Sequence, residues 1–387
     1  MGGIGQQIAE LRRAHIPRLT QADLAERADL TADAVAKIEQ GKRQASLAAL
    51  ERIAAALGVP TSSLLGGDAN VPAAPASVDE LEALELCQRA GASDVGEETI
   101  GRLEEAVDEL ARAYPVSQPA ELIGRVRSYL GYVIRLIDAR KTLAEYKRLL
   151  IVGSWLSLLG ATLHIDLEQP NAAKARLRTS MDLAKQTDSK EVVAWCLETR
   201  AWAALTQGDY ASALSLSRVA QEWAPKGSSI AIQATAQEGR SQARLGDEKG
   251  TYSALARVQG LVDPLAMPEH PEHHFTYDPN KATAYFGTTL AWLGDPAAEP
   301  YAREVISRLD GVGGWPRRVA SARIDLGLAL LTANKHDEAA ALAEKAVESG
   351  RIVPSNRWRV LEIVQAVEAR GLPEARSLRE AYQDTQS

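Results

Sequence analysis

The sequence predicts an all-α protein with two parts, a compact five-helix unit and a longer array of stacked helix pairs. Ala, Leu, Glu and Arg dominate the composition and aromatic residues make up only 5%, which favours helices because unbranched side chains lose little rotamer freedom there. Helical spacing continues after residue 78 without a convincing run of alternating β-branched residues, so no sheet is expected. At 387 residues the chain exceeds one typical domain of about 100–200 residues.

Composition and apolar stretches exclude several classes of protein. The two cysteines, Cys87 and Cys196, lie far apart in the sequence, which excludes a disulfide scaffold and a cysteine-based zinc module. The first residues lack the apolar stretch of a signal peptide. The longest apolar stretch, Leu149 to Ile165, is interrupted by glycine, serine and histidine, so we expect a buried helix and no membrane span. These features predict a cytoplasmic protein without a membrane partner.

Charge divides the chain at a linker. Residues 1–66 carry eight Lys/Arg and seven Asp/Glu, a net charge of +1, whereas the remainder carries 36 and 44, a net charge of −8. Residues 67–77 are rich in Gly, Pro and Ala and have no apolar repeat, which is typical of a linker. We therefore expect domains at 1–66 and 78–387, with different partners.

Five short helices are expected within residues 1–66, each with a recognisable start or stop signal. The first helix is expected over about 5–14, and the second begins after the N-cap Thr20, with Asp23 in a variant capping box. The third begins after Thr31 and stops at Gly41, and the fourth starts at Ser46 and ends before Gly58. A last helical turn follows Pro60. Apolar side chains at helical spacing predict a small core of Ile8, Leu11, Leu24, Ala25, Leu30, Val35, Ile38, Leu47, Leu50, Ile53 and Leu57.

The second and third of these helices form a helix-turn-helix. Only the residues from Asp29 to Thr31 separate them, which forces a tight angle. The segment 19–65 resembles the Cro/repressor-like (XRE) DNA-binding family through Thr20-Gln21, Ile-Glu-x-Gly-Lys-Arg at 38–43 and Leu-Gly-Val-Pro at 57–60. Asp29 stands where the family usually has glycine, so we expect a left-handed backbone there, which Asp tolerates at some cost.

This resemblance implies binding to a double-stranded DNA operator, with the third helix in the major groove. Carried over residue by residue, it assigns base reading to Thr31, Ala32, Asp33 and Lys37, and phosphate contacts to Gln21, Lys42, Arg43 and Ser46. Asp33 could accept from cytosine N4 and Lys37 could donate to guanine. A near-neutral domain binds DNA weakly by charge alone, so we expect a homodimer on an inverted repeat. The alternative is an ordinary solvated face on a protein-binding module.

The second part shows internal repeats. A turn followed by a helix of small residues recurs at Glu168, Gly208, Gly246, Gly294 and Asn334, with spacings of 40, 38, 48 and 40 residues. Such regularity predicts stacked helix pairs. The units resemble tetratricopeptide (TPR) repeats, with Ala161, Ala201, Gly239 and Gly327 at the small close-packing site of the preceding helix. The spacing exceeds the usual ~34 residues, so we expect a TPR-like α-solenoid with longer helices or larger loops.

Stacked helix pairs present a concave surface lined by the first helix of each pair. Counting back from each turn assigns to this surface Trp155, Trp195, Glu198, Trp202, Gln233, Arg240 and Lys281. One interpretation is a groove for a peptide or small-molecule effector, in which Arg240 or Lys281 takes an anion. The other is that the tryptophans pack between repeats, as large aromatics at helical spacing usually do.

The long interval between repeats contains His270, His273 and His274 beside several carboxylates. Metal binding is conceivable, but neighbouring histidines cannot easily point to one ion, so a structural loop is favoured and no metal is expected. The sequence contains no phosphate-binding glycine loop with lysine, no G-x-S-x-G and no H-E-x-x-H, so we expect no catalysis and no cofactor.

The two resemblances together imply a one-component transcription regulator, similar in architecture to peptide-responsive quorum-sensing regulators. The TPR-like domain would mediate dimerisation and sense an effector. The alternative is a DNA-binding adaptor whose repeats dock a protein partner without a small ligand. A third possibility is an interaction protein that reuses the helix-turn-helix fold.

Overall fold

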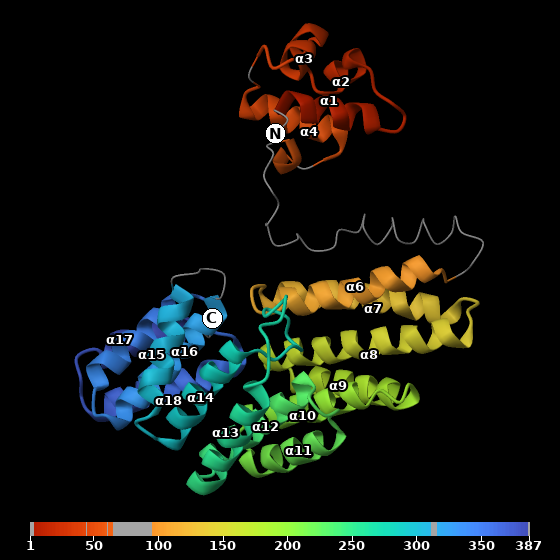
Figure 1. Cartoon of the computed structure of the whole chain (residues 1–387). Helices are drawn as coiled ribbons and strands as arrows, with labels where there is room; N and C mark the ends of the chain where they lie inside the picture. Colours follow the sequence, from red (N-terminus) through yellow and green to blue (C-terminus); the bar gives the residue numbers. More distant parts are fainter. Residues whose placement is uncertain (1–3, 44, 60, 65–94, 311–315, 386–387) are drawn as a thin grey trace. The chain divides into compact units, whose positions relative to one another are not determined.

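The computed structural model describes residues 4–43, 45–59, 61–64, 95–310 and 316–385. The described residues form α-helices and two short 3-10 helices, with no strand among them, which confirms the predicted all-α fold (Figure 1). The chain divides into two compact units, an N-terminal unit Met1–Ala73 and a C-terminal unit Ala74–Ser387. The predicted linker, residues 67–77, lies outside the described residues.

The N-terminal unit has its helices where the sequence predicts them. They are α1 (Ile4–Ala14), α2 (Gln21–Arg27), α3 (Ala32–Glu39), α4 (Leu47–Leu57) and η1 (Thr61–Leu64). Thr20 and Asp23 form the expected capping box at the start of α2. Gly58 ends α4 in the left-handed conformation, with φ 70°. The last element is a 3-10 turn, so the fifth helix is shorter than expected.

Close packing between α1 and α3 fixes the position of the helix-turn-helix. A Cβ atom at Gly5 would lie only 2.1 Å from the carbonyl oxygen of Ile38, so the start of α1 touches the backbone at the end of α3.

Asp29 adopts the expected left-handed conformation, with φ 51°. The N–H of Leu30 donates to the carbonyl of Ala25 across this turn at 2.9 Å, as in other helix ends of this type.

The C-terminal unit is a succession of antiparallel helices (Figure 1). In chain order they are α6 (Glu97–Ala113), α7 (Pro119–Asp138), α8 (Leu143–Asp166), α9 (Pro170–Gln186), α10 (Lys190–Thr206), α11 (Tyr210–Trp223), α12 (Ser229–Arg244), α13 (Glu248–Val262), α14 (Pro279–Leu293), α15 (Ala298–Asp310), α16 (Pro316–Thr332), α17 (His336–Glu348), η2 (Pro354–Asn356), α18 (Arg357–Ala369) and α19 (Ala375–Asp384). From α8 to α17, consecutive helices pack in pairs, which confirms the repeat array.

The five predicted turn residues share one backbone geometry. All have positive φ, namely Glu168 54°, Gly208 80°, Gly246 74°, Gly294 80° and Asn334 59°. In each turn, the N–H of the next residue donates to the carbonyl five positions earlier, for example Gln169 to His164 at 2.8 Å. This bond satisfies a carbonyl that the end of a helix leaves without a partner. The repeat signal in the sequence is therefore a recurring helix stop.

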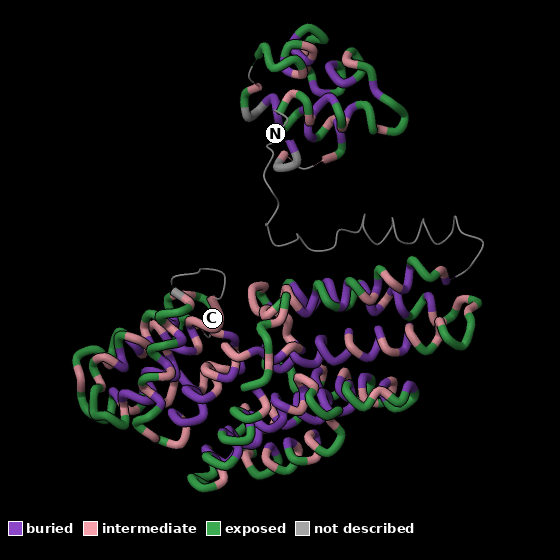
Figure 2. Tube along the Cα trace, viewed as in Figure 1, coloured by how far each residue is buried: buried purple, intermediate pink, exposed green. Residues whose placement is uncertain are grey.

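Small residues let the two helices of a pair approach closely. Ala161, Ala201, Gly239 and Gly327 each lie seven positions before a turn residue. A Cβ atom on Gly239 would lie 3.2 Å from Cβ of Ala254 on α13, and one on Gly327 would lie 3.4 Å from the carbonyl oxygen of Ala339 on α17. Figure 2 shows buried residues along α8, α10 and α12, and more exposed residues along α9 and α11.

Helix α8 contains the long apolar stretch. It is the one described helix long and apolar enough to cross a membrane, yet 89% of its most apolar window is buried within the protein. Neighbouring helices on several sides, among them α6, α7, α9 and α10, cover it. This confirms that the stretch from Leu149 to Ile165 is a core helix.

The later helices fold back toward the earlier ones. The hydroxyl of Ser355 donates to Asp166 Oδ1 at 3.3 Å, and Arg317 donates to the backbone carbonyl of Ser117 at 2.8 Å. Arg244 pairs with Glu362. These residues are more than a hundred positions apart in sequence, so the array closes around its own concave surface.

Candidate functional sites

Helix α3 presents the four predicted base-reading residues outward. Thr31, Ala32, Asp33 and Lys37 are exposed, while the opposite face of the helix is buried in the core of the unit. Lys37 Nζ donates to Asp33 Oδ2 at 2.7 Å, and these side chains are 52% and 72% exposed. An exposed pair at this spacing contributes about 0.3–0.5 kcal/mol, whereas a good base contact contributes about 1–3 kcal/mol. Base edges can therefore displace the pair.

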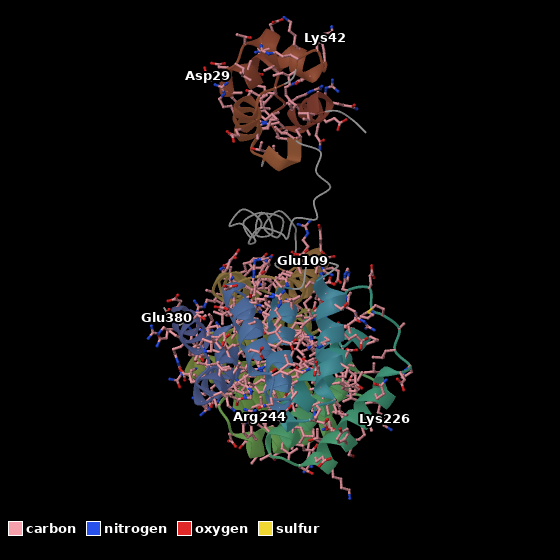
Figure 3. The ribbon with its side chains drawn as sticks, turned by 90° about the vertical axis from the view of Figure 1, so that its left-hand side faces the viewer. Asp29, Lys42, Glu109, Lys226, Arg244 and Glu380 are labelled. Carbon is pink, nitrogen blue, oxygen red and sulfur yellow. The ribbon has the colours of Figure 1, made fainter. Side chains whose placement is uncertain are left out.

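The four predicted phosphate-binding residues flank α3. Lys42 and Arg43 follow it and are exposed; Figure 3 labels Lys42 and Asp29 on this unit. The Ser46 hydroxyl accepts the N–H of Ala49, which leaves its own O–H as a donor. One N–H of the Gln21 amide donates to Glu39 at 2.7 Å, and the second remains for a phosphate.

A buried ion pair that the sequence analysis missed ties α1, α2 and α3 together. Arg12 Nε donates to Glu39 Oε1 at 2.7 Å, and another nitrogen of Arg12 donates to the carbonyl of Leu19 at 3.0 Å. Burial alone would raise the pKa of Glu39, but the hydrogen bonds that it accepts from Arg12 and Gln21 lower its pKa below the ordinary value. The available signal was position, because Arg12 follows the buried Ile8 by four residues on the same helical face.

The concave side of the C-terminal unit holds a cavity of about 280 Å³. Six of the seven predicted groove residues line it, namely Trp195, Glu198, Trp202, Gln233, Arg240 and Lys281. Trp155 does not, and its assignment to the groove needs correction. Its half-buried ring packs against Phe275, in the loop between α13 and α14, with centroids 4.8 Å apart.

This loop, residues 263–278, carries the three clustered histidines. The ring of Phe275 also packs against Trp195, with centroids 5.2 Å apart. The N–H of His274 donates to the carbonyl of Ala111 at 3.1 Å, and His273 Nε2 lies 3.3 Å from Asp108. These contacts hold the loop against α6 and α10. Among the described residues no group of three or more potential metal ligands gathers.

Charged side chains line the cavity on all sides. The cationic ones are Arg240, Lys281, Arg317, Arg318, Arg351 and Arg359, and the anionic ones are Asp166, Glu198, Glu272 and Asp325. Cations are thus in excess within a chain of net charge −7, and an excess of one sign in an enclosed space attracts the opposite charge.

Burial changes the ionisation of several of these groups. It raises the pKa of Asp166 to about 6, against the attraction of Arg317 and a hydrogen bond from the hydroxyl of Tyr114, which donates at 2.9 Å. Burial lowers the pKa of Lys281 to about 7. Lys281 Nζ donates to the carbonyls of His273 and Thr276, so its ammonium group fastens the loop as well as facing the cavity.

Several lining residues escaped the sequence analysis although the same counting rule reaches them. The rule takes the residue 13 positions before each turn residue, which gives Trp195, Gln233 and Lys281. Applied to the turn at Asn334, the same rule gives Ser321. Gly371 has a positive φ of 65° and is a further turn; 13 positions before it lies Trp358, which lines the cavity. The signal was present, and the missing step was to recognise Gly371 as a repeat turn.

Comparison with known proteins finds similarity for the N-terminal unit. Residues 4–64 match the model described as a helix-turn-helix domain, which confirms the resemblance drawn from sequence. The immunity repressor protein of Bacillus phage phi105 is 33% identical over 86 residues, which is 22% of this chain and 58% of the repressor. The match thus spans less than two thirds of that relative.

Two solved structures match parts of the chain at low similarity. PlcR of Bacillus thuringiensis, in complex with the peptide PapR7 and DNA, is 16% identical, with a TM-score of 0.27 over 68% of this chain and 95% of PlcR. The apo form of the competence regulator ComR from Streptococcus vestibularis is 13% identical, with a TM-score of 0.31 over 87% of this chain and 97% of ComR.

Proposed function

We propose that this protein is a sequence-specific DNA-binding transcription regulator whose C-terminal unit senses an effector. The observation that carries the proposal is the surface of α3. It exposes Thr31, Ala32, Asp33 and Lys37 on a helix-turn-helix domain that the buried Arg12–Glu39 pair holds together. The phage relative is an immunity repressor, which supports a role in control of transcription.

In this proposal α3 enters the major groove and α2 crosses the DNA backbone. Asp33 accepts from cytosine N4 and Lys37 donates to guanine, after their mutual ion pair opens. Lys42, Arg43, Gln21 and Ser46 bind phosphates, which set register and carry no sequence information.

Two copies of the chain bind one operator. The net charge of residues 1–66 is only +1, so a single domain gains little from counterion release. A homodimer on an inverted repeat doubles the contacts, with half-sites one helical turn of about 34 Å apart or a multiple of it.

The effector binds in the cavity lined by Trp195, Glu198, Trp202, Gln233 and Arg240. It controls DNA binding only if it binds one arrangement of the dimer more tightly than another, since equal affinity for both shifts no equilibrium. Native mass spectrometry of protein purified from cell extract distinguishes two cases. A bound low-mass species supports sensing, whereas a protein partner alone supports the adaptor function.

A gel shift against genomic fragments tests DNA reading. Full-length wild-type protein should retard a subset of fragments, and Lys37→Ala should lose that selective shift while its circular dichroism spectrum stays unchanged. Lys226→Ala, an exposed lysine on the C-terminal unit, is the matched control and should behave as wild type. Retardation of all fragments alike by wild type and by Lys37→Ala would rule out base reading by α3.

A further inference from the structure

The size of the cavity suits a small-molecule ligand. Its volume of about 280 Å³ is at the lower end of the ~300–1,000 Å³ found for small-molecule sites. The loop 263–278 covers the part of the concave surface next to Trp155 and Trp195 through Phe275. A peptide of several residues needs a longer open groove, and here the chain's own loop takes up part of that length.

Five buried nitrogen donors on lining residues have no hydrogen-bond partner among the described residues. They are Nε of Arg240 and Arg359 and the indole nitrogens of Trp195, Trp292 and Trp358. Buried polar groups in folded proteins nearly always have a partner. All five groups are donors, and each nitrogen is itself covered by neighbouring atoms, so a ligand that bonds to them must supply acceptor atoms and displace the side chains that cover them.

The two arginines also favour a negative charge. Arg240 and Arg359 are 8% and 4% exposed. The guanidinium of Arg240 lies 4.4 Å from the centre of the Tyr285 ring. One nitrogen of this guanidinium lies 3.9 Å from Oε1 of Glu198. Burial and the nearby charges of Arg240 and Arg244 lower the pKa of Arg359 to about 9, although Arg359 pairs with Asp325. A bound anion would relieve this repulsion.

Flat aromatic surfaces surround these donors. Trp202, Tyr285, Trp292 and Trp358 all line the cavity, and the rings of Trp292 and Trp358 lie 5.5 Å apart, centre to centre. Aromatic side chains of this kind bury large apolar area and stack on planar rings. The cavity thus combines aromatic walls with the guanidinium groups of Arg240 and Arg359, a side-chain group that binds carboxylates well.

We propose that the cavity binds a small organic anion, a planar ring system that carries a carboxylate, with the carboxylate on Arg240 and Arg359 and the ring among the tryptophans. The inference rests on the proposed function, because it names the class of effector for the same site. Lys281 is not part of the anion site, since its ammonium group already donates to two loop carbonyls.

The test is isothermal titration calorimetry of the full chain with naphthalene-1-acetate and with naphthalene-1-acetamide. The two probes have the same ring and nearly the same shape, and only the first carries a charge. We expect saturable one-site binding of the acetate, at least about tenfold tighter than that of the amide. Arg240→Gln should lose this preference and weaken acetate binding by at least about tenfold.

Two further variants control for folding and for charge. Arg218→Gln changes a half-exposed arginine on α11, outside the cavity lining, and should bind acetate as wild type does. Glu198→Gln/Arg240→Gln removes one charge of each sign, so that Glu198 is not left without its cation, and should still lose the preference for acetate. Thermal unfolding shows whether each variant folds.

Three results would overturn the proposal. They are equal affinity for acetate and amide, unchanged acetate affinity in both variants that lack Arg240, and saturable binding of a pooled heptapeptide library in the absence of acetate binding. Gel shifts in the same buffer separate this inference from the proposed function. Selective DNA binding without acetate binding defeats only the ligand class, whereas acetate binding without any DNA selectivity defeats only the regulator.

Discussion

The two units use the same kinds of side chain in opposite surroundings. In the N-terminal unit, Asp33 and Lys37 form an ion pair on the exposed face of one short helix. In the C-terminal unit, Asp325 and Arg359 form a pair whose side chains are both 5% exposed. Water screens the first pair and leaves it free to exchange partners, whereas the second stands in a low-dielectric interior where loss of either partner is costly. The two pairs therefore differ in exposure and not in the type of residue.

The largest expected effect comes from breaking the buried pair. Asp325→Ala leaves the charge of Arg359 without its carboxylate and removes the acceptor for the hydroxyl of Thr288, which donates at 2.6 Å. We expect a loss of about 3–5 kcal/mol in the free energy of unfolding of the C-terminal unit. Denaturant unfolding followed by tryptophan fluorescence measures it, since all seven tryptophans lie in this unit.

The matched variant in the N-terminal unit is Asp33→Ala. Its pair with Lys37 is exposed, so the expected loss of stability is below about 0.5 kcal/mol. Far-ultraviolet circular dichroism at 222 nm follows its unfolding. A similar loss in both variants would show that burial does not distinguish the two pairs.

A smaller effect tests the close packing between α16 and α18. Gly327→Ala places a methyl group 2.8 Å from Cδ1 of Ile363, the movable end of that side chain, so the cost should lie near the lower end of the about 1–3 kcal/mol that overpacking typically costs. Gly260→Ala is the control, because a Cβ atom on this exposed helical glycine meets nothing within 4 Å. We expect Gly260→Ala to be neutral or slightly stabilising. Equal tryptophan-monitored midpoints for the two variants would count against tight packing at Gly327.

Acidity should affect the cavity through Asp166. Its pKa is raised by burial to about 6 in the folded chain, above an unfolded value of about 3.9. The folded chain therefore holds this proton more tightly than the unfolded chain does. Protonation of Asp166 stabilises the fold fully at low pH, and this stabilisation is lost as pH rises through about 6. Between about pH 5 and pH 6.5 we expect a change of about 1 kcal/mol.

Asp166→Asn isolates this contribution, because the amide does not titrate. The difference in unfolding free energy between wild type and Asp166→Asn should vary with pH in this window, with wild type relatively more stable at the acidic end. A difference that stays constant from pH 5 to pH 6.5 would mean that Asp166 titrates elsewhere.

The smallest expected effect concerns a single phosphate contact. Lys42→Ala removes one exposed cation, so DNA binding should weaken by a similar factor for every sequence, and the slope of log K against log salt should fall by about 1. Fluorescence anisotropy with a selected and a scrambled duplex at several salt concentrations measures both. Weakening confined to the selected duplex would instead make Lys42 a base-reading residue.

The sequence predicts more of the N-terminal unit than of the cavity, for a physical reason. The candidate DNA-binding residues lie within one stretch from Gln21 to Ser46, so caps, turn and family motif place them together. The cavity takes residues from Tyr114 to Arg359, and the closure of the array depends on contacts such as Ser355 with Asp166. Repeat offsets gave Trp202 and Arg240 correctly as lining residues.

The remaining failures come from contacts that local patterns do not encode. Trp155 has the same offset as Trp195, yet Phe275 from the long loop covers it. The position of a loop on a distant surface depends on the whole array. The Arg12–Glu39 pair was missed for a related reason. A charged residue on a helix is usually solvated, so the position of Arg12 on a buried face is only a weak signal until its partner is known.

The most direct test of the central claim, that α3 reads bases through Asp33 and Lys37, is selection of duplexes from a randomised pool by the full-length protein. Wild type should enrich an inverted repeat, and Lys37→Ala should enrich a repeat that has lost its preference at one position in each half-site. Enrichment of one identical motif by both proteins, or of no motif by wild type, would contradict the account.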